Sequence, residues 1–180
     1  MLFAIDIGHN CPPADTGAVG IKKECNLAQE VGLKLISHLV GAGHEIILVT
    51  PQTARSVRES LRQRCYLANR ANADYYISIH FNAFNGEAHG TENFAISRTG
   101  WELAESINDE IASLGFRNRG VKKGDRLFVL RGTKMPAVLV ECCFCDSQKD
   151  MDLYNGDKMA IAIFTGIQKF LDLPIKNPDK

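Results

Sequence analysis

Short apolar runs alternate with longer amphipathic segments along almost the whole chain, and few folds accommodate this alternation. The apolar runs predict strands at 2–7, 45–50, 75–79, 91–96, 127–130 and 137–140. Apolar residues at helical spacing predict helices at 24–40, 53–72, 101–114, 147–154 and 158–171. Buried strands separated by helices are typical of α/β proteins. We therefore expect a single α/β domain: a mostly parallel twisted sheet of about six strands, with helices on both faces.

The ends of these segments add local expectations. Thr53 can accept a hydrogen bond from a following amide and is expected to cap the helix over 53–72. The apolar spacing in this helix places Val57, Leu61, Cys65 and Ala68 on its buried face. Residues 117–125 combine glycine with several basic residues and are expected to form a loop.

Length, charge and hydropathy restrict the class of protein. The chain has 180 residues, of which 45% are hydrophobic, enough to bury a core without disulfides. Its 21 basic and 21 acidic residues give a formal net charge of zero, which argues against a general nucleic-acid binder. No apolar run approaches the roughly 20 residues of a membrane span, and no signal peptide is visible. We expect a domain at 1–175 and a polar tail at 176–180, in a monomer that is made in the cytoplasm and neither binds nucleic acid nor inserts into a membrane.

Six cysteines stand at positions 11, 25, 65, 142, 143 and 145. The chain is too long and too apolar to resemble a disulfide scaffold, and Cys142, Cys143 and Cys145, which lie in one short segment, could hold a metal only with ligands from elsewhere. We therefore expect reduced cysteines that pack as small hydrophobic residues. A cysteine hydrolase that uses Cys143 or Cys11 stays open as an alternative, although nothing in the sequence places a base beside either thiol.

Four ionisable residues fall where the predicted elements begin or end. His9, His80 and Glu141 follow predicted strands, and Glu24 opens the first predicted helix. The carboxyl ends of parallel strands form one edge of a sheet, where ligands bind. Two histidines and one glutamate are a known zinc ligand set in hydrolytic sites, and a second carboxylate can then serve as general base. The pattern predicts a zinc-dependent hydrolase of an amide-like bond, with Glu141 moving the proton.

Ordinary structural roles compete with this interpretation. A histidine after a strand is commonly a hydrogen-bonded loop residue, and Glu24 suits the positive end of a helix dipole. Asp6 can accept hydrogen bonds from backbone amides or can orient a ligand histidine. A module that holds zinc or glycan without turnover also fits the pattern. Nucleotide binding does not, because no Gly-x-Gly-x-x-Gly motif follows the first strand.

Eight short blocks occur in the same order as in a known family. They read AIDIGH at 4–9, DTGAVG at 15–20, RANAD at 70–74, SIHFNA at 78–83, GTE at 90–92, RGVK at 119–122, LFVLR at 127–131 and PAVLVE at 136–141. With these blocks the chain resembles the zinc-dependent N-acetylmuramoyl-L-alanine amidases of the amidase-3 family. The segment after the last block is similar to phage endolysins and autolysins.

The resemblance implies hydrolysis of the amide bond between N-acetylmuramic acid and L-alanine in peptidoglycan. It implies one zinc ion per chain, held by His9, Glu24 and His80, with a zinc-bound water as nucleophile. Glu141 would take the water proton and give it to the alanine nitrogen. Four further residues are expected to bind substrate: Asn82, Arg119, Lys122 and Arg131.

The chain departs from the family pattern at places near the expected site. Ile7 stands where proline is usual, and cysteines follow Glu141 where a small residue and a glycine are usual. No long helix-rich insertion lies between Glu92 and Arg131, so we expect an open groove. The basic residues of 117–126 either attract the carboxylates of the stem peptide or belong to an ordinary solvated loop.

Overall fold

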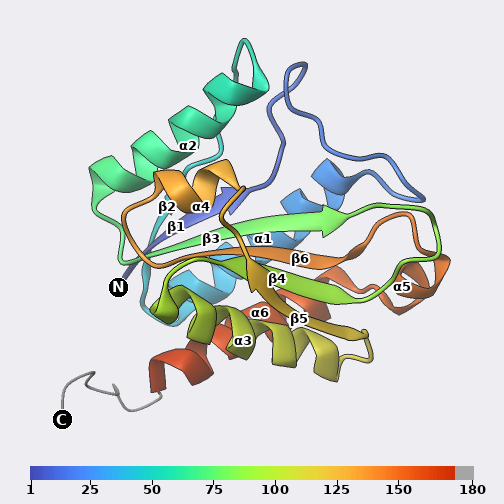
Figure 1. Cartoon of the computed structure of the whole chain (residues 1–180). Coiled ribbons are helices and arrows are strands. Elements are labelled where there is room, and N and C mark those ends of the chain that lie inside the picture. Colours follow the sequence, from blue (N-terminus) through green and yellow to red (C-terminus); the bar gives the residue numbers. More distant parts are fainter. Residues whose placement is uncertain (173–180) are drawn as a thin grey trace.

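A six-stranded sheet forms the middle layer of the fold, and helices cover both of its faces (Figure 1). The computed structural model describes residues 1–172. The strands are β1 (Leu2–Ile7), β2 (Glu45–Leu48), β3 (Tyr75–Asn82), β4 (Thr91–Ala95), β5 (Asn118–Lys123) and β6 (Ala137–Phe144). The helices are α1 (Glu24–Gly41), α2 (Val57–Ala71), α3 (Arg98–Ser113), α4 (Phe128–Gly132), α5 (Gln148–Leu153) and α6 (Gly156–Asp172). The expected α/β architecture is confirmed, while residues 173–175 and the expected tail at 176–180 lie outside the described residues.

The strand order β2-β1-β3-β6-β4-β5 makes the sheet mostly parallel, as expected. Within the described sheet, β4 pairs with β6 in antiparallel register, whereas the other neighbouring pairs are parallel. The pairing of β3 with β6 sets His80 opposite Glu141, and the pairing of β6 with β4 sets Glu141 opposite Glu92. Register partners place their side chains on the same face of a sheet, so these three residues form a row across adjacent strands.

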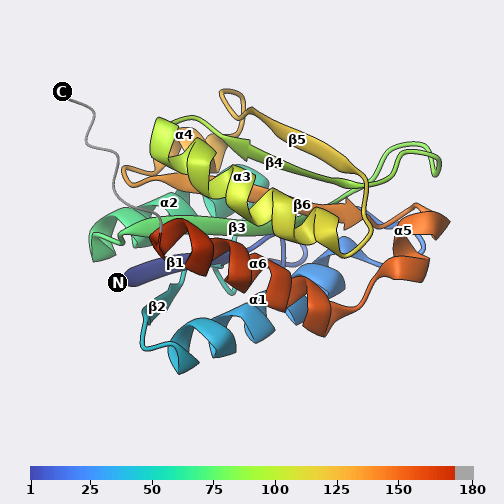
Figure 2. The ribbon, with the colours of Figure 1, turned by 90° about the horizontal axis from the view of Figure 1, so that it is seen from below.

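Alternation along the strands gives the sheet two apolar faces. In β1, Phe3 and Ile5 belong to the larger core cluster, whereas Ala4 belongs to the smaller one. Helices α1, α3 and α6 cover the face of the larger cluster, and α2 and α4 cover the other (Figures 1 and 2). Successive side chains of a strand point to opposite faces, so a central strand covered on both sides is apolar throughout. None of the helices within residues 1–172 is both long and apolar enough to span a membrane.

Three segments differ from the sequence prediction. The strand expected at 127–130 is instead part of helix α4 and the turn before it, because a four-residue apolar run does not distinguish a strand from a helical turn. The loop expected at 117–125 contains β5, which pairs with β4 at the edge of the sheet. Charged side chains are common on edge strands, because they discourage pairing with another chain. The strand expected to be buried at 45–50 is β2, a shorter edge strand with partly exposed residues.

Helix α2 begins later than expected. Ser56, not Thr53, caps it, and the Ser56 side chain accepts a hydrogen bond from a backbone amide of the first turn. Val57 is therefore exposed, and the buried face of the helix begins with Ser60 and Arg64. Two polar side chains, Ser60 and Arg64, thus lie against the interior, together with Cys65 and Ala68 farther along the helix.

Strands β3 and β6 extend beyond their expected ends at 79 and 140. His80 and Glu141 therefore lie within strands and not after them. Helix α3 begins at Arg98, before the expected start at 101, with Ser97 as its cap. Side chains on regular elements are held more precisely than side chains on loops, which favours a preorganised site.

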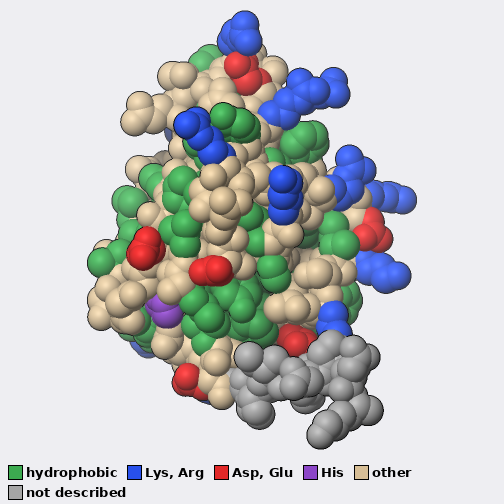
Figure 3. Space-filling view, turned by 90° about the vertical axis from the view of Figure 1, so that its left-hand side faces the viewer, with side chains coloured by type: hydrophobic (Ala, Val, Ile, Leu, Met, Phe, Trp, Pro, Cys, Tyr) green, Lys and Arg blue, Asp and Glu red, His purple; other side chains and the backbone are tan. Residues whose placement is uncertain are grey.

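Charged side chains are unevenly distributed, although the formal net charge is zero. Figure 3 shows the end of the molecule that lies on the left in Figure 1. Lys and Arg side chains gather along the upper and right-hand margins of this face, and hydrophobic side chains are exposed between them. A local excess of one charge attracts oppositely charged partners even when the whole molecule is neutral.

Candidate metal centre

His9, Glu24 and His80 come from three separate parts of the fold and meet at one point. His9 follows β1, Glu24 is the first residue of α1, and His80 lies in β3. One potential ligand atom from each lies within 4.8 Å of the other two. Glu24 Oε1 is 3.1 Å from His9 Nε2 and 3.0 Å from His80 Nδ1. The structure thus brings together the three residues that were expected to hold zinc.

Glycines allow the two histidine rings to approach each other. The Gly8 amide donates to the Ile79 carbonyl at 2.9 Å, which ties the end of β1 to β3. A Cβ atom at Gly8 would lie 2.6 Å from His80 Cε1. A Cβ atom at Gly17 would lie 2.7 Å from His9 Cδ2, and Gly17 also has a φ of 72°, which favours glycine. The ring positions therefore depend on the absence of a side chain at both glycines.

Glu24 turns back from the start of α1 toward the histidines. Its Oε2 accepts a hydrogen bond from the Ala18 amide at 2.8 Å, and its Oε1 accepts one from the Phe81 amide at 3.2 Å. These two amides hold the buried carboxylate in one orientation. A favourable helix dipole alone does not explain this conformation, because the carboxylate contacts groups from two other segments.

His9 lies between two carboxylates. Its Nδ1 is 2.6 Å from Asp15 Oδ1, and its Nε2 faces Glu24. Burial alone would lower the pKa of His9, but the hydrogen bonds with Asp15 and Glu24 outweigh it and raise this pKa to about 10. Burial would likewise raise the pKa of Glu24, yet His80 and His9 hold it well below its ordinary value. The group therefore favours a cation at this point, either a proton on a ring or a metal ion that replaces it.

The donor set also fits a metal ion. Zinc takes imidazole nitrogen and carboxylate oxygen ligands at about 2.1 Å, so two donors on one ion are at most about 4.2 Å apart. The separations of 3.0 and 3.1 Å around Glu24 Oε1 satisfy this limit. The side chains of His9 and His80 are 25% and 16% exposed, so solvent reaches the group.

Glu141 lies beside this group on the neighbouring strand. It is the register partner of His80, and its Oε2 is buried without a hydrogen-bond partner among residues 1–172. Burial raises the pKa of Glu141 to about 7. A buried carboxylate oxygen without a partner is costly and uncommon, so it calls for an explanation. A carboxyl group with this pKa can accept and return a proton near neutral pH.

Glu92 extends the row of side chains on the other side of Glu141. It accepts hydrogen bonds from Asn82 Nδ2 at 3.0 Å, Arg119 Nε at 2.5 Å and Lys122 Nζ at 2.6 Å. Burial would raise the pKa of Glu92, but Arg119 and Lys122 hold it below its ordinary value. Three of the four expected substrate-binding residues thus meet at one carboxylate. Sequence reasoning missed Glu92 as their common partner, because these contacts join residues of three different strands.

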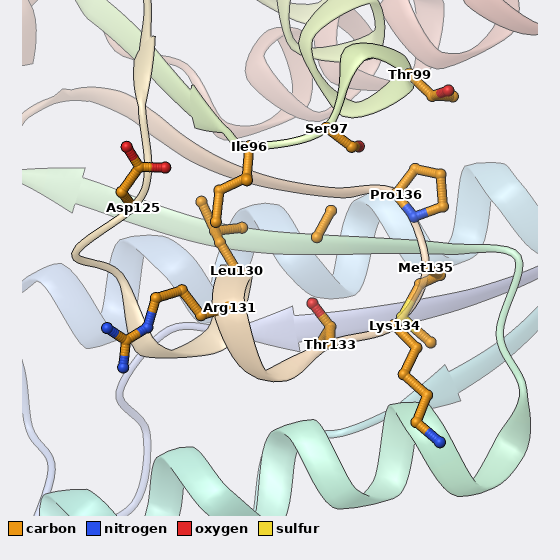
Figure 4. A pocket seen from close by; sticks show the side chains of 11 residues that line it. Ile96, Ser97, Thr99, Asp125, Leu130, Arg131, Thr133, Lys134, Met135 and Pro136 are labelled. Atoms are coloured by element: carbon orange, nitrogen blue, oxygen red, sulfur yellow. The ribbon is translucent and has the colours of Figure 1, made fainter.

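Two cavities lie on either side of helix α4. A cavity of about 320 Å³ borders the histidines and is lined by charged side chains, such as Asp15, and by apolar side chains, such as Leu61 and Phe128. A separate cavity of about 590 Å³ contains Arg131 and Lys134, whose side chains extend in opposite directions (Figure 4). The structure therefore does not bring Arg131 to the histidines, whereas the other three residues expected to bind substrate gather at Glu92, in the same row as His80 and Glu141.

Asp6 does not contact either histidine ring. It accepts hydrogen bonds from Tyr76 Oη at 2.6 Å and Ser78 Oγ at 2.7 Å, and it pairs with Arg64. Asp15, which sequence reasoning missed, is the carboxylate that contacts His9 Nδ1. Its place in the loop between two candidate ligands is the signal that could have identified it, because ligand histidines usually donate their second ring N–H to a nearby carboxylate or carbonyl.

The cysteines behave as small hydrophobic residues. In the described part of the chain all six thiols are free, and all except Cys25 are buried. Burial raises the pKa of the Cys143 thiol well above its ordinary value. A nucleophilic cysteine needs a lowered pKa and some exposure, so the structure gives no support to the alternative of a cysteine hydrolase at Cys143.

Comparison with known proteins identifies relatives over nearly the whole described chain. Residues 3–172 match the family model Amidase_3, described as N-acetylmuramoyl-L-alanine amidase. An uncharacterized protein of Clostridium perfringens (strain 13 / Type A) is 37% identical over 162 residues, which cover 86% of this chain and 47% of that protein. The endolysin of Bacillus phage SPP1 is 31% identical over 189 residues, which cover 98% of this chain and 68% of the endolysin.

Solved structures show the same similarity. The N-acetylmuramoyl-L-alanine amidase AmiC2 of Nostoc punctiforme matches this chain with a TM-score of 0.84 and 31% identity, covering 96% of this chain and 98% of that one. This chain spans about half the length of the two Clostridium perfringens relatives, 47% and 54%. Because the family model matches almost every described residue, the chain belongs to the Amidase_3 family of N-acetylmuramoyl-L-alanine amidases.

Proposed function

We propose that this chain acts on the bacterial cell wall and hydrolyses the amide bond between N-acetylmuramic acid and L-alanine in peptidoglycan. The supporting observation is the meeting of His9, Glu24 and His80 beside Glu141, whose buried Oε2 has no partner among the described residues. The relatives named as amidase and endolysin support the same class of reaction.

His9, Glu24 and His80 would hold the zinc ion in this proposal. Two imidazoles and one carboxylate leave a further coordination position, as hydrolytic zinc sites require. Zinc held there supplies a Lewis acid that polarises the scissile carbonyl and acidifies a water molecule. With the metal ion bound, Asp15 would keep the proton of His9 on Nδ1, so that the Nε2 lone pair would bind the metal in place of a proton.

Glu141 would move the proton. Its pKa of about 7 leaves a large fraction of the carboxylate ionised at neutral pH, ready to take a proton from the attacking water. When the bond between the lactyl carbonyl carbon and the alanine nitrogen breaks, the same carboxyl group returns the proton to that nitrogen. The products are a free lactyl carboxylate and a peptide with a new amino terminus, so atoms and charge balance.

Arg119 and Lys122 would attract the anionic stem peptide. Glu92 compensates one of their two positive charges, so the group keeps one excess positive charge beside Glu141. Asn82 completes this group through its contact with Glu92. Stem peptides contain free carboxylates, and a cationic group at the rim of a groove raises the local concentration of such a ligand. Arg131 has no part in this proposal, because it lines the separate cavity.

Digestion of purified peptidoglycan tests the proposal directly. We expect the zinc-loaded protein to release material with new L-alanine amino termini, a chelator to abolish the release, and added zinc to restore it. A module that binds the wall without turnover would sediment with peptidoglycan and produce no new amino termini. Absence of L-alanine termini from the zinc-loaded protein would overturn the proposed reaction.

A further inference from the structure

Arg64 is a fully buried arginine that contacts the chain around His9. It lies in α2, its side chain is 1% exposed, and it pairs with the equally buried Asp6. Its guanidinium also donates to the Ile7 carbonyl at 2.9 Å and to the His9 carbonyl. Burying a charge is unfavourable unless it is paired, and a buried ion pair commonly stabilises a fold no better than apolar residues of the same volume. Arg64 therefore calls for a role other than core packing.

The two carbonyls that Arg64 contacts flank the point where the chain leaves the sheet. His9 and Asn10 have φ angles of 57° and 53°, a left-handed conformation that is unfavourable for residues with a side chain. Hydrogen bonds from Asn10 Nδ2 to the Gly8 and Cys25 carbonyls, both at 2.9 Å, hold the same turn. Such backbone strain persists only where the surroundings impose it, and Arg64 is a main part of those surroundings.

The ring of His9 is connected to the same part of α2. Asp15 Oδ1 is 2.6 Å from His9 Nδ1, while Asp15 Oδ2 accepts a hydrogen bond from Ser60 Oγ at 3.0 Å and lies 3.6 Å from Arg64. Ser60 Oγ in turn accepts a hydrogen bond from Arg64 Nε at 3.1 Å. Ser60 and Arg64 are four residues apart, so they share one face of the helix. Both the backbone and the imidazole of His9 are thus held from α2.

We propose that Arg64 is a positioning residue that, together with Ser60 and Asp15, presets His9 to bind the metal ion. Arg64 fixes the His9 carbonyl directly, and it orients the His9 ring through Asp15. Carboxylates that orient a ligand histidine affect metal affinity about 10–100-fold when they are removed. This inference rests on the proposed function, because it requires zinc at His9, Glu24 and His80.

Zinc affinity of variant proteins tests the inference. The dissociation constant is measured by competition with a chromophoric chelator, and the absorption spectrum of bound Co²⁺ reports the ligand geometry. We expect Asp15→Asn and Arg64→Met each to weaken zinc binding about 10–100-fold. Arg64→Lys keeps the charge that pairs with Asp6 but loses the planar fork, so it weakens zinc binding and alters the Co²⁺ spectrum. Arg62→Met, at an exposed arginine of the same helix, is the matched control and leaves the zinc affinity and the Co²⁺ spectrum unchanged.

Folding is measured on the metal-free forms. Arg64→Met leaves Asp6 without its buried partner, so if it fails to fold, Ser60→Ala and Asp15→Asn decide the question. The inference is overturned if Arg64→Lys, Ser60→Ala and Asp15→Asn all fold and bind zinc within about twofold of the unchanged protein. The unchanged protein is measured alongside: failure to bind zinc there overturns the proposed function, whereas zinc binding that no variant alters overturns only the positioning role.

Discussion

Glu141 occupies an environment that is unusual for a carboxyl group. It lies in a strand whose other residues are buried and apolar, and its Oε2 has no partner among residues 1–172. Arg64 differs from Glu141, because the buried charge of Arg64 is compensated by Asp6 and Asp15. A carboxylate left without compensation beside a candidate metal site fits the proton transfer proposed for it better than a role in stability.

Replacing Glu141 by glutamine separates catalysis from metal binding. We expect Glu141→Gln to lower the rate of release from peptidoglycan by about 10²–10⁴-fold, because the amide cannot accept a proton. Zinc content should stay at one per chain, and the protein should unfold at the same temperature or higher. Rate measurements with zinc analysis check both. Glu87→Gln, in an exposed loop, is the control, and a Glu141→Gln rate within tenfold of the unchanged protein would contradict the assigned role.

Glu92 predicts a pH dependence of stability. Arg119 and Lys122 hold its pKa below the ordinary 4.5 despite burial. The folded state therefore favours the ionised form of Glu92. Its contribution to the free energy of unfolding is complete above pH 4.5 and is lost as the pH falls through the folded-state pKa. Between pH 7 and pH 3, we expect the free energy of unfolding to fall less in Glu92→Gln than in the unchanged protein. Denaturant titrations at pH 7 and at pH 3 measure the free energy of unfolding of each protein.

The exposed Glu87 offers a matched control for this titration. Glu87→Gln should leave the difference between the two pH values unchanged. Equal acid sensitivity of Glu92→Gln and the unchanged protein would show that the contacts of Arg119 and Lys122 with Glu92 do not contribute to stability.

Helix α2 shows how one element boundary affects the site. The helix begins after Ser56, and its residues Ser60 and Arg64 face inward and reach Asp15. Ser60 is the fourth residue of the helix, so the turn that the cap holds in helical conformation also carries a side chain that contacts Asp15. The position of the cap and the support of His9 are therefore linked.

The two candidate caps of α2 can be compared directly. We expect Ser56→Ala to lower the free energy of unfolding by about 1 kcal/mol, because the amide of Glu59 loses its side-chain acceptor. Thr53→Ala, at an exposed position before the helix, should change it by less than about 0.5 kcal/mol. Chemical denaturation measures both. A larger effect at Thr53 than at Ser56 would mean that the helix begins where the sequence pattern placed it.

At the scale of the whole molecule, the candidate metal centre joins parts of the chain that are far apart. His9, Glu24 and His80 come from the end of β1, the start of α1 and the interior of β3. An ion bound to these three residues would link the sheet to helix α1. A ligand that binds only the folded state raises stability according to its concentration relative to its dissociation constant.

Zinc should therefore stabilise the protein against heat. With free zinc at about 1,000 times its dissociation constant, the expected gain is about 4 kcal/mol, or roughly 8–16 °C in Tm for a chain of this size. His80→Ala should lose most of this shift, whereas His89→Ala, in the loop before β4, should keep it. Thermal unfolding with chelator and with zinc measures both, and a zinc shift that His80→Ala retains would exclude this site.

Local periodicity was sufficient to predict the α/β architecture, because the spacing of apolar residues reports which face of each element is buried. It also led to His9, Glu24 and His80, since the carboxyl ends of parallel strands meet at one edge. The helical state of α4, the strand β5, and the contacts of Asp15, Arg64 and Glu92 were not predicted. Each of these depends on which segments become neighbours in space, and a contact between distant side chains leaves no periodic trace along the chain.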